Sequence, residues 1–335
     1  MFKCYVKDLN TLKIFLRLND TEYVDMLLNK GSSTIISNST AVFGCYSLIT
    51  ETTTIFSPIT FRIPTKVLKN LACEGYFYVD SDSDNITVSF FTSNDVKNAT
   101  VTFIRQDIFA DSYEHKLTLL SNTKNYGKPF RIGELNKLCK ISKSSGGIIT
   151  ADNGVIGSTL SGRGRIFYVP TDDKLVNQKF SVTASELSIL LSLTNKVHNI
   201  ENYLCASKSN LAVLVTKCNS SSNDEYQLLE MAKAKYRCKV NIIHVVSFLK
   251  NMGIKIKTLE LDLEKRVCSF DERHMHYEIP FSVTDMEKSP AAELDTIMVP
   301  VILINEICNG IDMEFLIERK KNFTKISKEN TFIYF

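Results

Sequence analysis

The hydrophobic and polar positions of the chain form a recurring pattern: a short apolar strand, then Pro, Gly, Thr or Asn, then a short amphipathic helix. Phe61-Arg62-Ile63-Pro64 and Phe130-Arg131-Ile132-Gly133 are nearly the same phrase. The six copies start at Phe2, Phe61, Phe130, Phe180, Cys238 and Ile297, at intervals of 59, 69, 50, 58 and 59 residues. A spacing this regular predicts an internal structural repeat.

The segment after each predicted helix alternates apolar and polar residues on both sides of a polar turn, which is typical of an antiparallel hairpin. Residues 76–79, a turn at 81–85 and residues 86–90 are the clearest case, and residues 319–322 form the turn of the last copy. The predicted helices are 9–18, 65–72, 133–143, 184–196, 240–251 and 301–309.

Consecutive copies, taken in pairs, predict an α+β chain of three tandem domains, each with two helices and about eight strands. The boundaries are 1–110, 111–235 and 236–335, with joins near 107–111 and 220–224, the latter a polar stretch of linker composition. The alternative is an α+β protein that alternates helices and hairpins without a true repeat.

Three domains, each a pair of strand-helix-hairpin units, resemble the bacterial sliding clamp, the DNA polymerase processivity factor related to the two-domain clamps of eukaryotes and archaea. One local echo is Thr150 to Gly157, where bacterial clamps carry an Ala-Thr-Asp-Gly-His-Arg-Leu-like strand; the His-Arg-Leu part is missing here. The resemblance implies a homodimeric ring with helices around a central hole and sheets outside. It also implies duplex DNA without sequence preference, a DNA polymerase and a clamp loader as partners, and a bacteriophage is a natural source.

The charge pattern agrees with helices that face DNA. The net charge of +3 is small, but the predicted helices carry nine basic and three acidic residues, +6, which leaves −3 elsewhere. Glu134 and Glu186 lie in first helical turns, where the helix dipole favours acids. The alternative is the charged outer face that any amphipathic helix has. The candidate DNA-facing residues are Lys13, Arg17, Lys66, Lys69, Lys137, Lys140, Lys143, Lys196 and Lys250.

Clamps of this family hold polymerases in a hydrophobic pocket at the junction of the last two domains. The chain ends in the apolar Phe332-Ile333-Tyr334-Phe335, which fits one side of such a pocket and equally fits the last strand of the third domain. The candidate pocket residues are Asn153, Gly154, Ile156, Tyr226, Leu228, Leu229, Ile333, Tyr334 and Phe335.

No motif predicts catalysis or a cofactor, so we expect a protein that is not an enzyme. Asp80, Asp82 and Asp84 alternate as in a calcium loop, but Asn85 and Phe91 replace its glycine and glutamate, which favours a solvated turn. His274 and His276 have no metal-ligand spacing around them. The segment 161–165 lacks the ending of a phosphate-binding loop.

The nine cysteines are odd in number and scattered, which predicts reduced thiols, and no leader or long apolar span is apparent. We therefore expect a cytoplasmic protein of a bacterium or an infected host. Two other functions stay open: a monomeric clamp-fold factor that holds DNA electrostatically, and a non-catalytic structural repeat protein.

Overall fold

The protein is described by a computed structural model that covers residues 1–6, 8–18, 21–52, 58–69, 75–92, 94–106, 108, 113–122, 128–143, 146–159, 164–219, 223–301, 304, 308 and 312–335. The chain divides into two compact units. The first comprises Met1–Gly133 and Glu186–Lys217, and the second comprises Glu134–Ser185 and Cys218–Phe335. This division runs through the range 111–235, so the predicted three-domain boundaries stay a prediction.

The predicted repeat is present in the backbone as a strand, a helix and three further strands. Copy 1 is β1 (Phe2–Tyr5), α1 (Leu9–Leu18), β2 (Tyr23–Leu28), β3 (Gly31–Asn38) and β4 (Val42–Thr52). Copy 2 is β5 (Ile59–Pro64), α2 (Thr65–Lys69), β6 (Gly75–Ser81), β7 (Asn85–Thr92) and β8 (Lys97–Ile104). Copy 3 is β9 (Phe130–Arg131), the 3-10 turn η3 (Gly133–Leu135), α4 (Asn136–Lys143), β10 (Ile148–Asp152), β11 (Val155–Thr159) and β12 (Arg165–Tyr168).

The second half of the chain follows the same order. Copy 4 is β13 (Phe180–Thr183), α6 (Ala184–Leu193), β14 (Lys196–Ile200), β15 (Tyr203–Lys208) and β16 (Leu211–Thr216). Copy 5 is β17 (Ala234–Asn241), α8 (Ile243–Met252), β18 (Thr258–Asp262), β19 (Val267–Glu272) and β20 (Met275–Pro280). Copy 6 is β22 (Thr296–Pro300), β23 (Glu314–Lys320), β24 (Thr324–Lys328) and β25 (Thr331–Tyr334), and most of its predicted helix, 301–309, lies outside the described residues.

Four more elements join these copies: α3 (Glu114–Ser121), α5 (Asp173–Val176), α7 (Asp224–Met231) and β21 (Ser282–Lys288). The predicted joins 107–111 and 220–224 lie mostly outside the described residues, as does 161–163. None of the described helices is long and apolar enough to cross a membrane.

The helix ends have local causes. The Asp8 carboxylate accepts a hydrogen bond of 3.1 Å from the Thr11 backbone N–H and so caps the start of α1. Gly253 ends α8 in the left-handed conformation, at a φ of 66°, where glycine has no Cβ to clash. Two predicted boundaries are wrong for a simple reason: residues 240–241 continue β17, and Lys196 begins β14, because strand pairing there prevails over helical periodicity.

Strands pair reciprocally between copies 1 and 2, between copies 3 and 4, and between copies 5 and 6. The first strand of each copy pairs antiparallel with the second strand of the other: β1 with β6, β5 with β2, β9 with β14, β13 with β10, β17 with β23 and β22 with β18. The core of the first unit is the layer between such strands and the helices. Phe15 of α1 and Tyr46 of β4 are fully buried there, and Gly44 leaves space for Leu18, whose Cδ1 lies 2.8 Å from where a Cβ would stand.

The last strands of the copies make the longer sheets. In the first unit β4 pairs with β16, with Phe43 opposite Leu214, and this pairing joins the strands of copies 1, 2 and 4 into one sheet. In the second unit β12 pairs with β25, with Phe167 opposite Phe332. We call β4–β16 the first seam and β12–β25 the second seam. The remaining last strands, β8 and β20, are the ends of their sheets in the described part of the chain.

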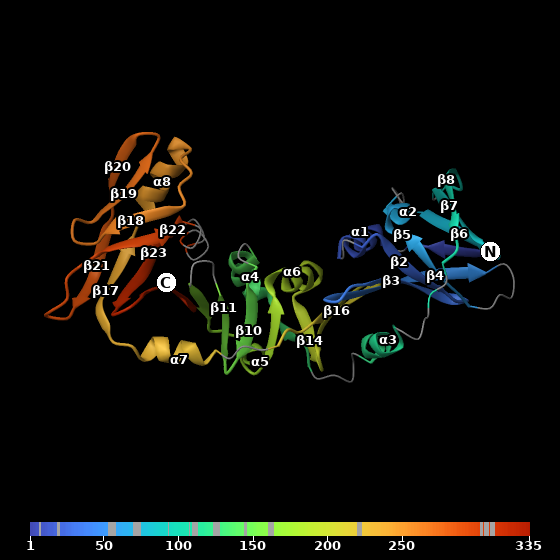
Figure 1. The fold of residues 1–335 in the computed structure, drawn as a ribbon, viewed down its shortest axis with the longest axis horizontal. Helices are drawn as coiled ribbons and strands as arrows, with labels where there is room; N and C mark the ends of the chain where they lie inside the picture. Colours follow the sequence, from blue (N-terminus) through green and yellow to red (C-terminus); the bar gives the residue numbers. More distant parts are fainter. Residues whose placement is uncertain are drawn as a thin grey trace. The chain divides into compact units, whose positions relative to one another are not determined.

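A helix outside the repeat covers each seam (Figure 1). At the first seam Tyr113 and Leu119 of the α3 segment are buried with Phe43 and Leu214. The Tyr113 hydroxyl donates to the Asp25 carboxylate, which is 5% exposed and also accepts from the Arg62 Nε at 2.8 Å. A buried carboxylate with these two donors satisfies its hydrogen-bonding needs and fixes α3 to β2 and β5.

Candidate nucleic-acid interface and partner site

Most of the predicted DNA-facing side chains lie on the solvent side of the repeat helices. Lys13 and Arg17 of α1 are exposed, opposite the buried Leu12 and Leu16. Lys66, Lys69, Lys140, Lys143 and Lys250 are exposed as well, and Lys137 is half-buried. The amphipathic spacing of each helix places the apolar residues on the sheet and leaves the cations outside.

The five described repeat helices hold eight lysines and arginines and one glutamate, a net charge of +7, so the rest of this +3 chain carries −4. Helix α6 has no lysine or arginine and carries the one glutamate, Glu186, together with exposed Ser185 and Ser192. Lys196 is exposed but stands at the start of β14, so it is a strand residue and does not belong to this helical set.

Glu134, the acid nearest to these cations in the sequence, has a local role. Its carboxylate accepts hydrogen bonds from the Tyr168 hydroxyl at 2.6 Å and the Thr171 hydroxyl at 2.7 Å. Desolvation opposes its ionisation, but these bonds prevail and lower the pKa of Glu134 below its ordinary value. A carboxylate engaged in this way is directed into its own unit.

The predicted partner residues divide into buried and accessible groups. Ile156 and Ile333 are 1% and 0% exposed, and Tyr334 is 2% exposed, because β11 and β25 are inner strands of the sheet. Phe335 is half-buried and exchanges backbone hydrogen bonds with Thr324. Residues 331–334 therefore form β25, the last strand along the chain, buried between β12 and β24, which agrees with the second of the two alternatives that the sequence left open.

The accessible group lies on α7 and on the turn between β10 and β11. Asn153 is exposed and Gly154 half-buried in that turn, both at positive φ. On α7 the Tyr226 ring lies between Phe167 and Phe332, at centroid distances of 5.1 and 6.1 Å. Leu228 is 70% exposed and faces away from the sheet.

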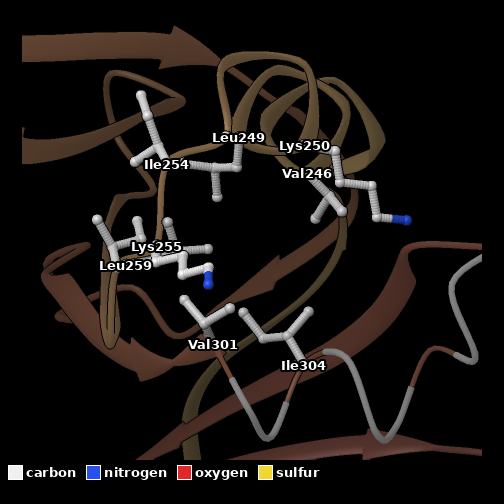
Figure 2. Close-up of a pocket in the computed structure, with 10 residues that line it drawn as sticks. Val246, Leu249, Lys250, Ile254, Lys255, Leu259, Val301 and Ile304 are labelled. Carbon is white, nitrogen blue, oxygen red and sulfur yellow. The ribbon is translucent and has the colours of Figure 1, made fainter.

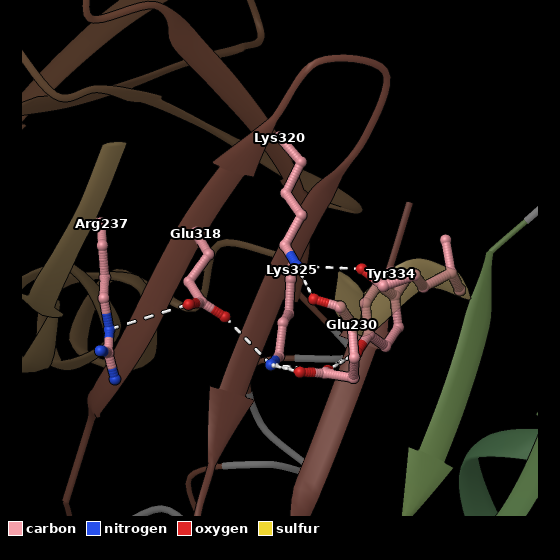
Figure 3. A network of polar contacts seen from close by, with 7 residues as sticks. Glu230, Arg237, Glu318, Lys320, Lys325 and Tyr334 are labelled. Atoms are coloured by element: carbon pink, nitrogen blue, oxygen red, sulfur yellow. Dashed lines mark hydrogen bonds and ion pairs between the residues drawn. The ribbon is translucent and has the colours of Figure 1, made fainter. Parts of the chain in front are cut away.

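A buried polar network fixes α7 to the sheet (Figure 3). The Lys325 ammonium, whose side chain is 7% exposed, lies 2.7 Å from a Glu230 carboxylate oxygen and 3.0 Å from one of Glu318. The Lys320 Nζ donates to the Leu229 and Glu230 carbonyls at 2.9 and 3.0 Å and so caps the C-terminal turn of α7. The Tyr334 hydroxyl donates to the Glu230 carboxylate. Leu229, on α7 itself, is half-buried.

No sequence pattern predicts this network. Residues 319–322 were predicted as a turn, but Lys320 is the last residue of β23 and 3% exposed. A lysine in an alternating strand normally points to solvent, and here α7 covers that face of the sheet. Only the position of α7 makes Lys320 and Lys325 interior residues.

Two cavities lie in the second unit, and the larger of these two adjoins the predicted partner residues, because its lining includes Glu230, the acceptor of the Tyr334 hydroxyl. One, of about 390 Å³, lies between α8, the segment 253–259, Val301 and Ile304 (Figure 2). Its walls are mostly apolar, and the side chains of Lys250 and Lys255 also line it. The other, of about 710 Å³, is a charged groove over β17, β21, β23 and β24 that includes Glu230 and Lys325.

The residues considered for metals have other roles. The Asp82 carboxylate accepts from the backbone N–H groups of Asp84 and Asn85, which makes the segment a hairpin turn. His276 Nδ1 lies 2.7 Å from Asp271 across the β19–β20 pair, and Asp271 raises the pKa of His276. The eight described cysteines are free thiols, and burial raises the pKa of Cys4, Cys45 and Cys205 to about 12.

Solved structures of the DNA polymerase III β subunit match almost the whole chain. The β subunit of Pseudomonas aeruginosa matches with a TM-score of 0.65 at 11% identity, over 100% of this chain and 99% of that one. The chain has the clamp fold. The β subunit of Borrelia burgdorferi, solved with a natural product, matches this chain with a TM-score of 0.64 at 10% identity, over 99% of this chain and 96% of that one.

A third clamp-fold match is the Helicobacter pylori β clamp bound to a DNA ligase peptide, with a TM-score of 0.65 at 11% identity, over 100% and 98% of the two chains. No family model and no curated protein matches this sequence. The predicted α+β clamp fold is thus confirmed, and at these identities the likeness concerns the fold.

Proposed function

We propose that this chain is a DNA sliding clamp, a ring of two copies that encircles duplex DNA and tethers a replicative polymerase without any reaction of its own. The observation that carries the proposal is the pairing of last strands. Copy 1 pairs with copy 4 through β4 and β16, and copy 3 pairs with copy 6 through β12 and β25. The same rule assigns β20 of copy 5 to β8 of copy 2, and within one chain both remain at sheet ends.

A second copy supplies the missing partner for each strand. In this assembly β8 of one chain pairs with β20 of the other. Two such head-to-tail contacts close a ring of two copies. Ile104 of β8 is 76% exposed and Met275 of β20 is 53% exposed, as expected of strands that become buried in an assembly.

The charge of the repeat helices supports duplex DNA as the ligand. Lysines and arginines without base-reading chemistry bind phosphates independently of sequence, and release of counterions makes that binding salt-dependent. The excess of +7 on these helices against −4 elsewhere would place the favourable potential on the helical side of each unit.

Retention on circular DNA tests the proposal. Chains dissociated in mild urea are returned to native buffer together with a relaxed plasmid. The mixture is then passed over a sizing column in about 0.5 M salt, which weakens phosphate contacts. We expect protein to stay with the circle and to be released when one restriction cut makes it linear. Equal, salt-sensitive binding to both forms would instead support the monomeric electrostatic factor, and no binding to either would support a structural repeat protein.

The polymerase is expected to bind the accessible residues at the second seam, namely Leu228 with Asn153 and Gly154. A clamp loader would be needed to open the ring, and its ATP site belongs to that partner. Leu228→Lys is expected to abolish stimulation of the cognate polymerase and to leave retention on circles unchanged. If stimulation persists, the partner surface lies elsewhere.

A further inference from the structure

A second surface of the first unit combines aromatic rings with a lysine. Lys3 and Tyr5 of β1, Tyr76 and Tyr78 of β6 and Phe91 of β7 alternate with core residues, so they share the outer face of the sheet. We call these five residues the tyrosine face. Tyr76 is 7% exposed and the other four are half-buried.

The Lys3 ammonium lies in the middle of these rings. It is 4.0 Å from the Tyr76 ring centroid, 5.1 Å from that of Tyr5 and 5.7 Å from that of Tyr78. Tyr76 stacks on Phe91 at 5.3 Å. Rings this close attract a cation through their negative faces.

The hydroxyls at the rim already have acceptors. The Tyr5 hydroxyl donates to Glu51 at 2.9 Å, and that of Tyr76 donates to Asp95. Glu51 stands directly opposite Lys3 in the β1–β4 pair, and Asp95 borders the face beside Tyr76. The surface around the Lys3 ammonium is otherwise formed by the rings. In the described part of the chain no carboxylate forms an ion pair with Lys3.

The second seam shows what covers such a surface. There the Lys325 ammonium lies 4.7 Å from the Phe332 centroid and 5.9 Å from that of Tyr334, also on an outer sheet face. Helix α7 covers it with an aromatic ring, Tyr226, and with a carboxylate four residues later, Glu230, which pairs with Lys325. Residues four apart lie on one side of a helix, so a single short helix supplies both groups.

We propose that the tyrosine face is a docking site for a short helix of a partner protein that carries an aromatic residue and, four positions later, a single carboxylate. The carboxylate pairs with Lys3 and the aromatic residue packs on Tyr78 and Phe91. Glu51 and Asp95 at the rim repel further acids, so the partner segment has one carboxylate on this side and is neutral or basic beside it. This site is separate from the ring closure and from α7.

A peptide with the sequence of residues 223–232 is a direct probe when Asp224→Asn, Glu225→Gln and an amidated C-terminus leave Glu230 as its single carboxylate. The chain has no tryptophan, so a peptide with Tyr226→Trp reports its own binding through its fluorescence. We expect saturable binding to the full-length chain. Glu230→Gln in the peptide and Lys3→Gln in the chain should each weaken binding about fivefold or more, in the range of a desolvated charge pair.

The two changes together should cost no more than one alone, because each removes the same pair. Tyr78→Thr in the chain should weaken binding as well, whereas Lys30→Gln, at an exposed turn, should not. Absence of saturable binding, binding unchanged by Lys3→Gln, or additive losses in the double change would each overturn the proposal. Retention on circular DNA, measured in the same Lys3→Gln protein, should remain that of the unchanged chain.

Discussion

The first and second seams are built alike in the backbone and differently in the side chains. Both pair the last strand of an odd copy with the last strand of an even copy, and both lie under a helix outside the repeat. At the first seam the sheet supplies a buried acid, Asp25, and α3 supplies a hydroxyl. At the second the sheet supplies buried lysines and α7 supplies the acid, Glu230.

The difference shows that the repeat preserves strand pairing and leaves the polar contacts under each helix free to change. Strand pairing is set by backbone hydrogen bonds, which many sequences satisfy. A buried charge requires a particular partner at a particular place. We therefore expect substitutions in the two networks to act on one seam each.

The largest effect is expected for Lys325→Met, which leaves Glu230 and Glu318 without their shared cation. The free energy of unfolding should fall by about 3 kcal/mol, the low end for breaking a buried pair, because Glu230 is partly exposed. The urea midpoint measures this. Lys328→Met on the same strand is the control, since its partner Asp312 is exposed, and it should cost about 0–1 kcal/mol. Equal losses would contradict the assigned network.

Asp25→Ala should cost about 2 kcal/mol, because Arg62 and Tyr113 lose a charged acceptor. Hydrogen exchange should rise in α3 and leave α7 unchanged, whereas Lys325→Met should do the reverse. Asp84→Asn, in an exposed turn, should stay within about 0.5 kcal/mol of the original chain. Exchange that rises at both seams would mean that they are not independent.

Ile104→Lys adds a charge to the β8 edge and should weaken self-association at least tenfold, about 1.4 kcal/mol, without changing either seam. Sedimentation over a concentration series measures it. Leu228→Lys is matched in size, exposure and charge change and should associate normally. An unaffected dimer would move the interface away from β8.

Replacing Lys66 and Lys69 by glutamine should lower the slope of log affinity for duplex DNA against log salt by about 2, one for each lost phosphate contact. Titrations at several salt concentrations give the slope. Lys30→Gln with Lys233→Gln removes two exposed lysines outside the repeat helices and should leave the slope unchanged. An equal drop in both pairs would contradict a helix-specific interface.

The smallest effect concerns pH. Burial opposes ionisation of Glu230, but Lys325 and Tyr334 prevail and lower its pKa in the folded chain. Its stabilising contribution is therefore present above the ordinary value of 4.5 and is lost as pH falls through the lower folded pKa. Urea midpoints between pH 6 and pH 3 should fall less steeply for Glu230→Gln. Identical slopes would mean that Glu230 does not titrate with folding.

Most of the fold could be predicted because it is repeated. Six phrases such as Phe61-Arg62-Ile63-Pro64 each give a strand, and after five of them the structure describes a helix at the predicted place. Two predicted helix ends differ from the structure. Lys196 and residues 240–241 belong to strands, because they pair with strands that are distant in the sequence. The cations of α1, α2 and α4 followed from amphipathic spacing.

The surroundings of the proposed partner residues were harder to predict from the sequence. In the sequence Ile333 and Tyr334 resemble an exposed apolar terminus, but in the fold their strand pairs with β12 on one side and β24 on the other. Lys3, Lys320 and Lys325 look like ordinary strand lysines. Their surroundings come from strands and helices that are distant in sequence, which a local pattern does not record.

The mass of the native chain in solution tests the central claim most directly. Light scattering at micromolar and then nanomolar concentration should give a stable species of twice 37.9 kDa, as a closed ring of two copies requires. A species that stays at 37.9 kDa at every concentration would contradict the ring and leave the clamp fold as a monomeric, salt-sensitive DNA tether.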